Sequence, residues 1–120
     1  MVLQNQVSSL ELSKKLKELG VNLNSLFGWV DNSETIDEVG TKIKFLLFGI
    51  IFIRKNNLEY ISAFTVAELG EMLPEGFYSE KNQGSWLGLH AIRPCKLYKA
   101  DTEANVRTKI LIHLKENNLI

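Results

Sequence analysis

The amino-acid sequence predicts an α+β fold in which a mainly antiparallel sheet of about five strands carries three helices. Three segments have the caps and apolar spacing of helices, and the residues between them have strand chemistry. The order of these elements lacks the regular alternation of a doubly wound parallel sheet. At 120 residues, 45% hydrophobic and 23% charged, the chain is long enough for one core. We therefore expect a single domain over residues 1–120.

The first predicted helix covers Ser9–Leu19. Ser8 and Glu11 have the spacing of a capping box, and leucines at positions 12, 16 and 19 recur on one face. Gly20 supplies the left-handed residue that ends such a helix. These signals agree on where the helix begins and where it ends.

Two further helices are predicted later in the chain. Thr65 and Glu68 form a second capping box, and Pro74 closes a short helix behind them. The last helix begins at Asp101 as the N-cap and ends near Asn117. Its core face carries apolar side chains at four-residue spacing, namely Val106, Ile110 and Leu114.

The clearest strand signal is Lys42–Arg54, in which apolar residues occupy both faces. Such a strand is either covered on both sides or presents one face to a partner. The polar residues 55–57 predict a tight turn into Leu58–Ala63, which would complete a hairpin. A shorter strand, Leu26–Val30, precedes an acidic loop over Asp31–Thr41.

A second hairpin is predicted from Gly76–Glu80 and Ser85–Ile92, joined by the polar turn at residues 81–84. A last extended piece, Lys96–Lys99, leads into the third helix.

The best local candidate for a ligand site lies on Ser85–Ile92. Strand alternation places Trp86, Gly88 and His90 on one face, with a gap at the glycine between the two rings. A ligand could stack on Trp86 and hydrogen-bond to His90, with Tyr78 contributed by the paired strand. The alternative, which the sequence favours, is that Trp86 covers the core and His90 is a half-exposed strand residue.

No catalytic, metal or cofactor site is predicted. Cys95 is the single cysteine, so it has neither a disulfide partner within the chain nor a metal-binding pair, and a structural thiol is expected. His113 falls on the flank of the last helix, and the acids of the loop (Asp31, Glu34, Asp37 and Glu38) do not match an EF-hand. Phosphate-binding and hydrolase motifs are absent from the sequence. We lean against an enzyme.

Fourteen Lys and Arg balance fourteen Asp and Glu, and the resulting zero net charge argues against nucleic acid as a partner. The charges nevertheless occur in blocks: residues 42–58 carry four bases and no acid, and residues 59–80 carry five acids and no base. Opposite blocks can pair within the sheet or face a partner. Without a signal peptide or an apolar run long enough to span a bilayer, a cytoplasmic protein with no membrane contact is expected.

Three segments, Leu12–Val21, Ile61–Pro74 and Ala100–Ile120, resemble a group of small uncharacterised proteins of phages, prophages and related mobile elements. The resemblance covers about half the chain, mostly its predicted helices. It implies a bacterial cytoplasm and an accessory role, and it implies no activity, cofactor or site residue.

Together these observations predict a non-catalytic protein-protein interaction module that self-associates or binds a protein partner. The predicted strand with apolar residues on both faces and the lack of a group of catalytic residues favour this function. The alternative is a small-ligand binding protein or enzyme that uses the Trp86 and His90 face.

Overall fold

The computed structural model describes residues 3–36, 42–90 and 98–120, and within them the fold is α+β as predicted. Its strands form two three-stranded antiparallel sheets in place of the single five-stranded sheet that the sequence suggested. The described elements are η1 (Leu3–Asn5), α1 (Leu10–Glu18), β1 (Phe27–Ile36), β2 (Lys42–Gly49), α2 (Ile50–Lys55), β3 (Ile61–Ser62), α3 (Val66–Met72), β4 (Phe77–Asn82), β5 (Ser85–His90), β6 (Tyr98–Ala100) and α4 (Glu103–Glu116). Four α-helices are thus seen in the described ranges, one more than predicted.

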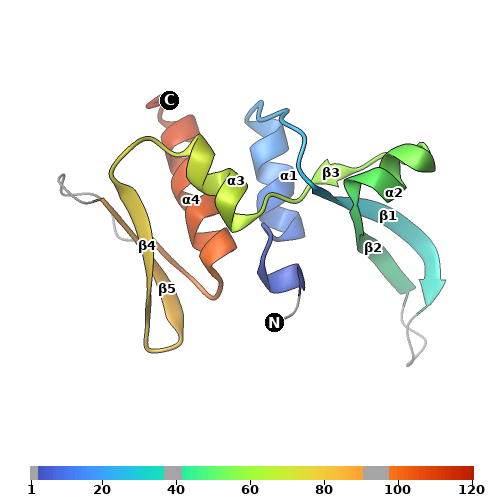
Figure 1. Cartoon of the computed structure of the whole chain (residues 1–120), viewed down its shortest axis with the longest axis horizontal. Helices are drawn as coiled ribbons and strands as arrows, with labels where there is room; N and C mark the ends of the chain where they lie inside the picture. Colours follow the sequence, from blue (N-terminus) through green and yellow to red (C-terminus); the bar gives the residue numbers. More distant parts are fainter. Residues whose placement is uncertain (1–2, 37–41, 91–97) are drawn as a thin grey trace.

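Helices α1, α3 and α4 lie between the two sheets (Figure 1). The first sheet has the order β2-β1-β3 and carries α2 above it, whereas the second has the order β4-β5-β6 and lies against α4. We call these the N-terminal sheet and the C-terminal sheet. Because each sheet is short, neither can bury a core alone, and the helices provide the surface on which each one packs.

Helix α4 is the centre of the apolar core. One buried cluster joins it to α1 and α3 through Leu16, Leu69 and Leu111, and a second joins it to the C-terminal sheet through Tyr98, Val106 and Ile110. The predicted positions Val106, Ile110 and Leu114 are all buried. The four-residue spacing read from the sequence was therefore a correct guide to the core face of α4.

The starts of the three predicted helices were correct to within one residue. Thr65 and Glu68 form the predicted capping box in full: the Thr65 hydroxyl accepts from the Glu68 N–H, and the Glu68 carboxylate accepts from the Thr65 N–H. The N-cap of α1 is Ser9 rather than Ser8, and the N-cap of α4 is Thr102 rather than Asp101. In both helices the N-cap is one residue later than predicted, and the hydroxyl of that later residue accepts the capping hydrogen bond.

The long apolar strand was predicted to run to Arg54, but β2 ends at Gly49 and the next six residues form α2. Gly49 is the N-cap, and the Ile50 N–H donates to the Leu26 carbonyl at 2.8 Å. Arg54 and Lys55 occupy the last turn, where the helix dipole favours cations. Asn57 follows in the left-handed conformation with φ of 53°.

The strand pairing around α2 also corrects the prediction. No hairpin forms across residues 55–57, because β3 pairs with β1 and not with β2. β2 instead pairs antiparallel with β1, which is longer than predicted and extends to Ile36. The first part of the predicted acidic loop thus belongs to a strand, with an irregularity in the pairing between Asp31 and Thr35.

The second predicted hairpin is confirmed. β4 pairs with β5 along its whole length, and the turn between them consists of Gln83 and Gly84, both with positive φ. β6 then pairs with β5 from the other side. It begins at Tyr98, whereas residues 96 and 97 of the predicted extended piece lie outside the described residues.

Candidate functional site

The face of β5 that carries Trp86, Gly88 and His90 lies on α4. A Cβ atom placed on Gly88 would be 2.6 Å from the Ile110 Cδ1 atom, so Ile110 fills the gap that was predicted to receive a ligand. Trp86 packs at the edge of the cluster formed by Tyr98, Ala100, Val106, Ile110 and Leu114. The glycine is therefore needed for the close approach of sheet and helix, and the face is mainly a packing surface.

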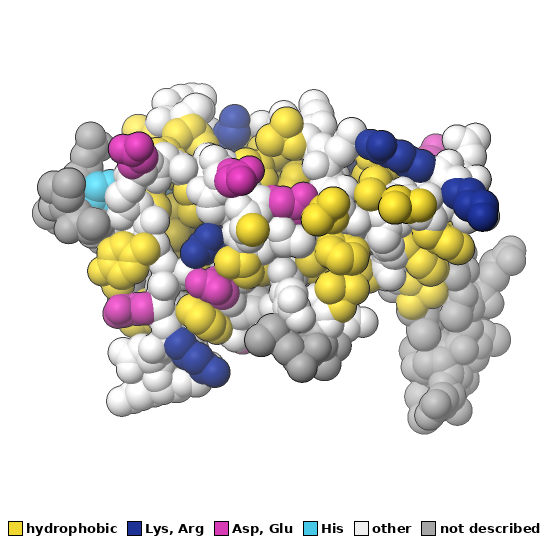
Figure 2. All heavy atoms as spheres, viewed as in Figure 1, with side chains coloured by type: hydrophobic (Ala, Val, Ile, Leu, Met, Phe, Trp, Pro, Cys, Tyr) yellow, Lys and Arg dark blue, Asp and Glu magenta, His cyan; other side chains and the backbone are white. Residues whose placement is uncertain are grey.

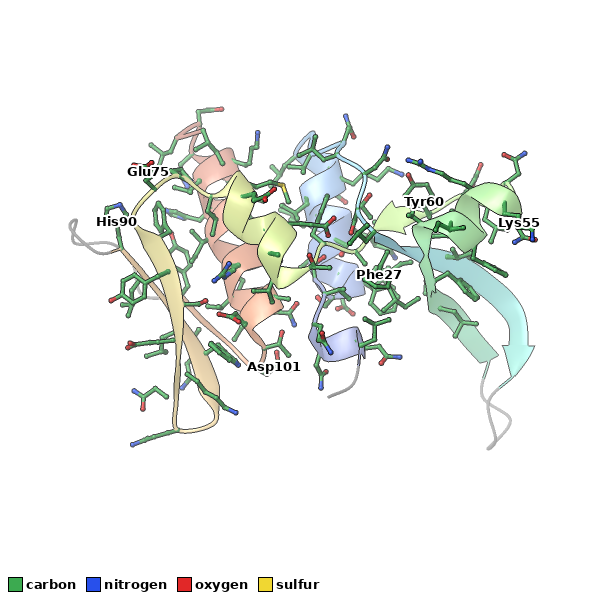
Figure 3. The ribbon with its side chains drawn as sticks, viewed as in Figure 1. Phe27, Lys55, Tyr60, Glu75, His90 and Asp101 are labelled. Atoms are coloured by element: carbon green, nitrogen blue, oxygen red, sulfur yellow. The ribbon has the colours of Figure 1, made fainter. Side chains whose placement is uncertain are left out.

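His90 lies at the far end of the same face, beside the start of β4 (Figure 3). Its ring makes an edge-to-face contact with Phe77, with ring centroids 4.7 Å apart. It also covers Gly76, where a Cβ atom would be 2.5 Å from its Nε2 atom. His90 is half-buried by these contacts.

Tyr78 lies on the opposite face of the C-terminal sheet. It pairs with Leu89, whereas its neighbour Phe77 pairs with His90, and successive residues of a strand point to opposite faces. The Tyr78 side chain is 43% exposed. The structure therefore does not bring Tyr78 together with Trp86 and His90.

Trp86 does border an open cleft of about 590 Å³ between the two sheets. Phe27, at the start of β1, and Asp101, just before α4, lie on different sides of it (Figure 3). The remaining lining residues come from η1, the start of α3, the tip of the C-terminal hairpin and the start of α4: Leu3, Asn5, Gln6, Thr65, Val66, Ala67, Lys81, Thr102 and Glu103. His90 is not among them.

Several polar groups of this cleft are already held by hydrogen bonds. The Glu103 carboxylate accepts from the Ser79 hydroxyl at 2.5 Å and pairs with Arg107 at 3.5 Å. The Thr65 and Thr102 hydroxyls cap α3 and α4. The Ser79 hydroxyl does not line the cleft, and it also accepts from Arg107 at 3.1 Å, so it is held in a network with Glu103 and Arg107. The cleft therefore offers a ligand mainly the aromatic surface of Trp86 and Phe27.

The most exposed large apolar side chain among the described residues lies on α2, and two other exposed apolar side chains lie near it, one on α2 and one just before β1. Leu26, Ile51 and Phe52 are 61%, 81% and 47% exposed, and we call these three residues the apolar surface. Hydrophobic side chains gather over this part of the molecule, and basic side chains lie beside them (Figure 2).

Local packing holds the apolar surface in place. Ile53, on the other side of α2, is 1% exposed and lies against Gly28 of β1, where a Cβ atom would be 2.8 Å from it. Phe52 stacks on Phe48 of β2 with ring centroids 4.8 Å apart. Because α2 buries Ile53 inward, Ile51 is turned outward.

The sequence pattern identified this apolar segment but predicted a strand where the structure has the helix α2. In a strand that ran to Arg54, Ile51 and Ile53 would share one face, whereas in the helix Ile53 is buried and Ile51 is exposed. The signals that distinguish the two were present: a glycine before the apolar run, two bases at its end and two asparagines after it.

The other candidate residues form no site in the described ranges. His113 lies on α4 and makes an edge-to-face contact with Tyr98 at 5.6 Å. Cys95, Asp37 and Glu38 lie outside the described residues, and the part that is described holds no group of three potential metal ligands. Nor does any described helix have the length and apolar character needed to cross a bilayer.

Comparisons with known proteins add no relative. No protein-family model, no curated protein and no solved structure matches this chain.

Proposed function

We propose that this chain is a non-catalytic interaction module that self-associates through its apolar surface, Leu26, Ile51 and Phe52. The observation that supports this most directly is Ile51, whose side chain is 81% exposed on a helix held in place by its buried neighbour Ile53. Water-exposed apolar side chains gathered on an ordered element are typical of a contact surface.

The energetics favour such a contact. Removing an isoleucine or phenylalanine side chain from water stabilises a complex by roughly 1.5–3 kcal/mol at full burial. Because the formal net charge of the chain is zero, two copies are not kept apart by overall charge repulsion. A second copy is therefore a suitable occupant for this surface.

The test is size-exclusion chromatography with light scattering over a range of protein concentrations. We expect the wild-type mass to rise toward twice the 13.6 kDa of one chain. Ile51→Asp should stay at the mass of one chain, because it would place a charge in the contact. A wild-type protein that runs as a monomer at millimolar concentration would overturn the proposal.

Leu119→Asp is the matched control. Leu119 is 62% exposed and follows α4, on a different element from the apolar surface. This variant should associate as the wild type does. Circular dichroism should show that both variants keep the fold, since neither side chain is buried.

A second candidate function is small-ligand binding in the cleft that Trp86 and Phe27 border. The observation that favours it is the 590 Å³ volume beside an aromatic side chain. We expect an aromatic metabolite or nucleotide in a screen to raise the unfolding temperature of the wild type and to lose this effect in Trp86→Leu. A screen without a hit would remove this candidate and leave the interaction module untouched.

A further inference from the structure

We infer that the free edge of β2 pairs antiparallel with β2 of a second copy, so that the two N-terminal sheets become one six-stranded sheet. This inference rests on the proposed self-association and adds the element that carries it and the direction of the pairing. Its starting observation is that β2 is at the edge of the sheet order β2-β1-β3.

The edge is long enough for stable pairing. β2 covers eight residues, Lys42–Gly49, and spans about 27 Å, whereas the opposite edge is the two-residue strand β3. Within the described part of the chain β1 is its only strand neighbour, so the backbone N–H and C=O groups on its other side have no partner strand. A second extended strand would satisfy these groups.

Two of the devices that usually protect an edge strand, a proline and a bulge, are absent from β2, although its first half carries the lysines Lys42 and Lys44. β2 contains no proline, and its only glycine is the last residue. The irregularity in this sheet lies on β1, between Asp31 and Thr35, and not on the outer strand. The residues Phe45, Leu46, Leu47 and Phe48 are all partly exposed, although none is polar. An accessible apolar edge of this kind tends to pair with another chain.

Charge selects the direction of pairing. Lys42 and Lys44 are both in the first half of β2, and the second half carries no charge. Antiparallel pairing places the lysines of the two copies at opposite ends, whereas parallel pairing would place like charges side by side. An antiparallel pair also has twofold symmetry and closes as a dimer.

The apolar surface is continuous with this edge. α2 begins directly after Gly49, so Ile51 and Phe52 lie at the C-terminal end of β2. In an antiparallel dimer this end lies beside the start of the second copy's β2. The same contact can therefore bury both the strand edge and the side chains of the apolar surface.

Two consecutive proline substitutions test the edge directly. Neighbouring residues of a strand direct their N–H groups to opposite sides, so one of Leu46→Pro and Leu47→Pro removes a hydrogen bond to β1 and the other removes an outward N–H. We expect one variant to keep the monomer fold by circular dichroism and to dissociate at least ten-fold more readily than the wild type. Leu46→Thr and Leu47→Thr are the controls, because they keep the N–H groups.

Amide hydrogen exchange of the wild type tests the inference even if both proline variants unfold. Raising the protein concentration should slow exchange at alternate amides of residues 42–49. If the wild type forms a dimer while these amides are unaffected, or while a folded proline variant still forms it, the edge pairing is wrong and the self-association stands. If the wild type is a monomer, both proposals fail.

The salt dependence of binding distinguishes two possible partners of the β2 edge, a second copy of this chain and an acidic protein. Self-pairing of a segment that carries four bases and no acid over residues 42–58 should be unchanged or strengthened by 0.5 M salt. Binding of an acidic partner would weaken under the same conditions. Dissociation of the wild-type dimer by salt would therefore contradict the inferred pairing.

Discussion

Ser8 and Phe64 are joined by two hydrogen bonds, although 56 residues separate them. The Ser8 N–H donates to the Phe64 carbonyl at 2.8 Å, and the Phe64 N–H donates to the Ser8 hydroxyl at 3.0 Å. The Ser8 carbonyl accepts from the Trp29 indole at 3.1 Å. Ser8 thus links the start of α1 to β1 and to the segment before α3, which explains why it is buried instead of capping the helix.

Replacing Ser8 with alanine should destabilise the protein by about 1–3 kcal/mol, because the Phe64 N–H would be left buried without its acceptor. The Ser13 hydroxyl, 2.7 Å from that of Ser8, would also lose a partner. Urea denaturation followed by circular dichroism measures the change. Gln4→Ala, on an exposed side chain of η1, is the control and should change the free energy of unfolding by less than about 0.5 kcal/mol. Equal stability of Ser8→Ala and wild type would refute the role assigned to the serine.

Gly88→Ala should destabilise the protein by about 1–3 kcal/mol through overpacking against α4. The new Cβ atom would lie 2.6 Å from Ile110 Cδ1 and 3.2 Å from Tyr98 Cβ. Thermal unfolding monitors the loss. Gly49→Ala is the control for steric overlap, because no atom lies within 4 Å of the Cβ position at Gly49, and its effect should be limited to the poorer N-cap of α2.

Ile110→Val tests the cause of that loss, since it removes the Cδ1 atom nearest to the new methyl group. Alone it should cost about 0.5–1.5 kcal/mol. Combined with Gly88→Ala, the total should be smaller than the sum of the two single changes. Strict additivity would show that the strain does not arise from Ile110.

Gln83→Asn should stabilise the C-terminal hairpin by about 0.5–1 kcal/mol. Gln83 has φ of 50° and is followed by Gly84 with φ of 82°, so both turn residues are left-handed. Asparagine tolerates this conformation better than glutamine, and Asn-Gly is the preferred pair in such turns. Chemical denaturation should show the gain, whereas Gln83→Val should show a loss. A gain with valine would exclude backbone conformation as the reason.

Arg107→Lys should cost about 1–3 kcal/mol, because an ammonium group cannot reproduce the spread of guanidinium contacts. Arg107 donates to the Ser79 hydroxyl at 3.1 Å and to the Val66 carbonyl at 3.0 Å, and so joins α4 to β4 and α3. The free energy of unfolding in urea provides the measurement. Glu116→Gln is the control, because its pair with Lys15 is exposed and should contribute almost nothing. If lysine at position 107 proved as stable as arginine, the bridging role would be wrong.

Much of the fold could be predicted from local chemistry. The capping box at Thr65, the core face of α4 and the C-terminal hairpin depend on neighbouring residues, so a window of the sequence contains their cause. The choice between one sheet and two could not be read this way. It depends on which strands pair across long stretches of chain: β3 pairs with β1 across more than 30 residues, and no described strand of the first sheet pairs with one of the second. Local sequence windows do not contain the information that selects these partners.

The candidate sites also combine features that local sequence predicts with features that depend on distant contacts. Alternation along β5 correctly placed Trp86, Gly88 and His90 on one face, but only the position of α4 shows that this face is turned inward. For residues 50–55 the hydrophobic content alone fits a strand and a helix equally well, and the flanking residues that favour the helix, Gly49 before it and Asn56 and Asn57 after it, were interpreted as parts of a strand and a turn. The choice between strand and helix decides which isoleucine, Ile51 or Ile53, is exposed to solvent. Because a strand was predicted, the apolar surface was not predicted.

The central position of α4 also has a consequence for how the protein is made. Both buried clusters include residues of α4, which is synthesised after every other element of the described fold. A ribosome-bound chain that stops before residue 103 therefore carries two unfinished cores, and its apolar residues stay open to chaperones and proteases. The two cores can close only after α4 has left the ribosomal tunnel, because both are completed by the same helix.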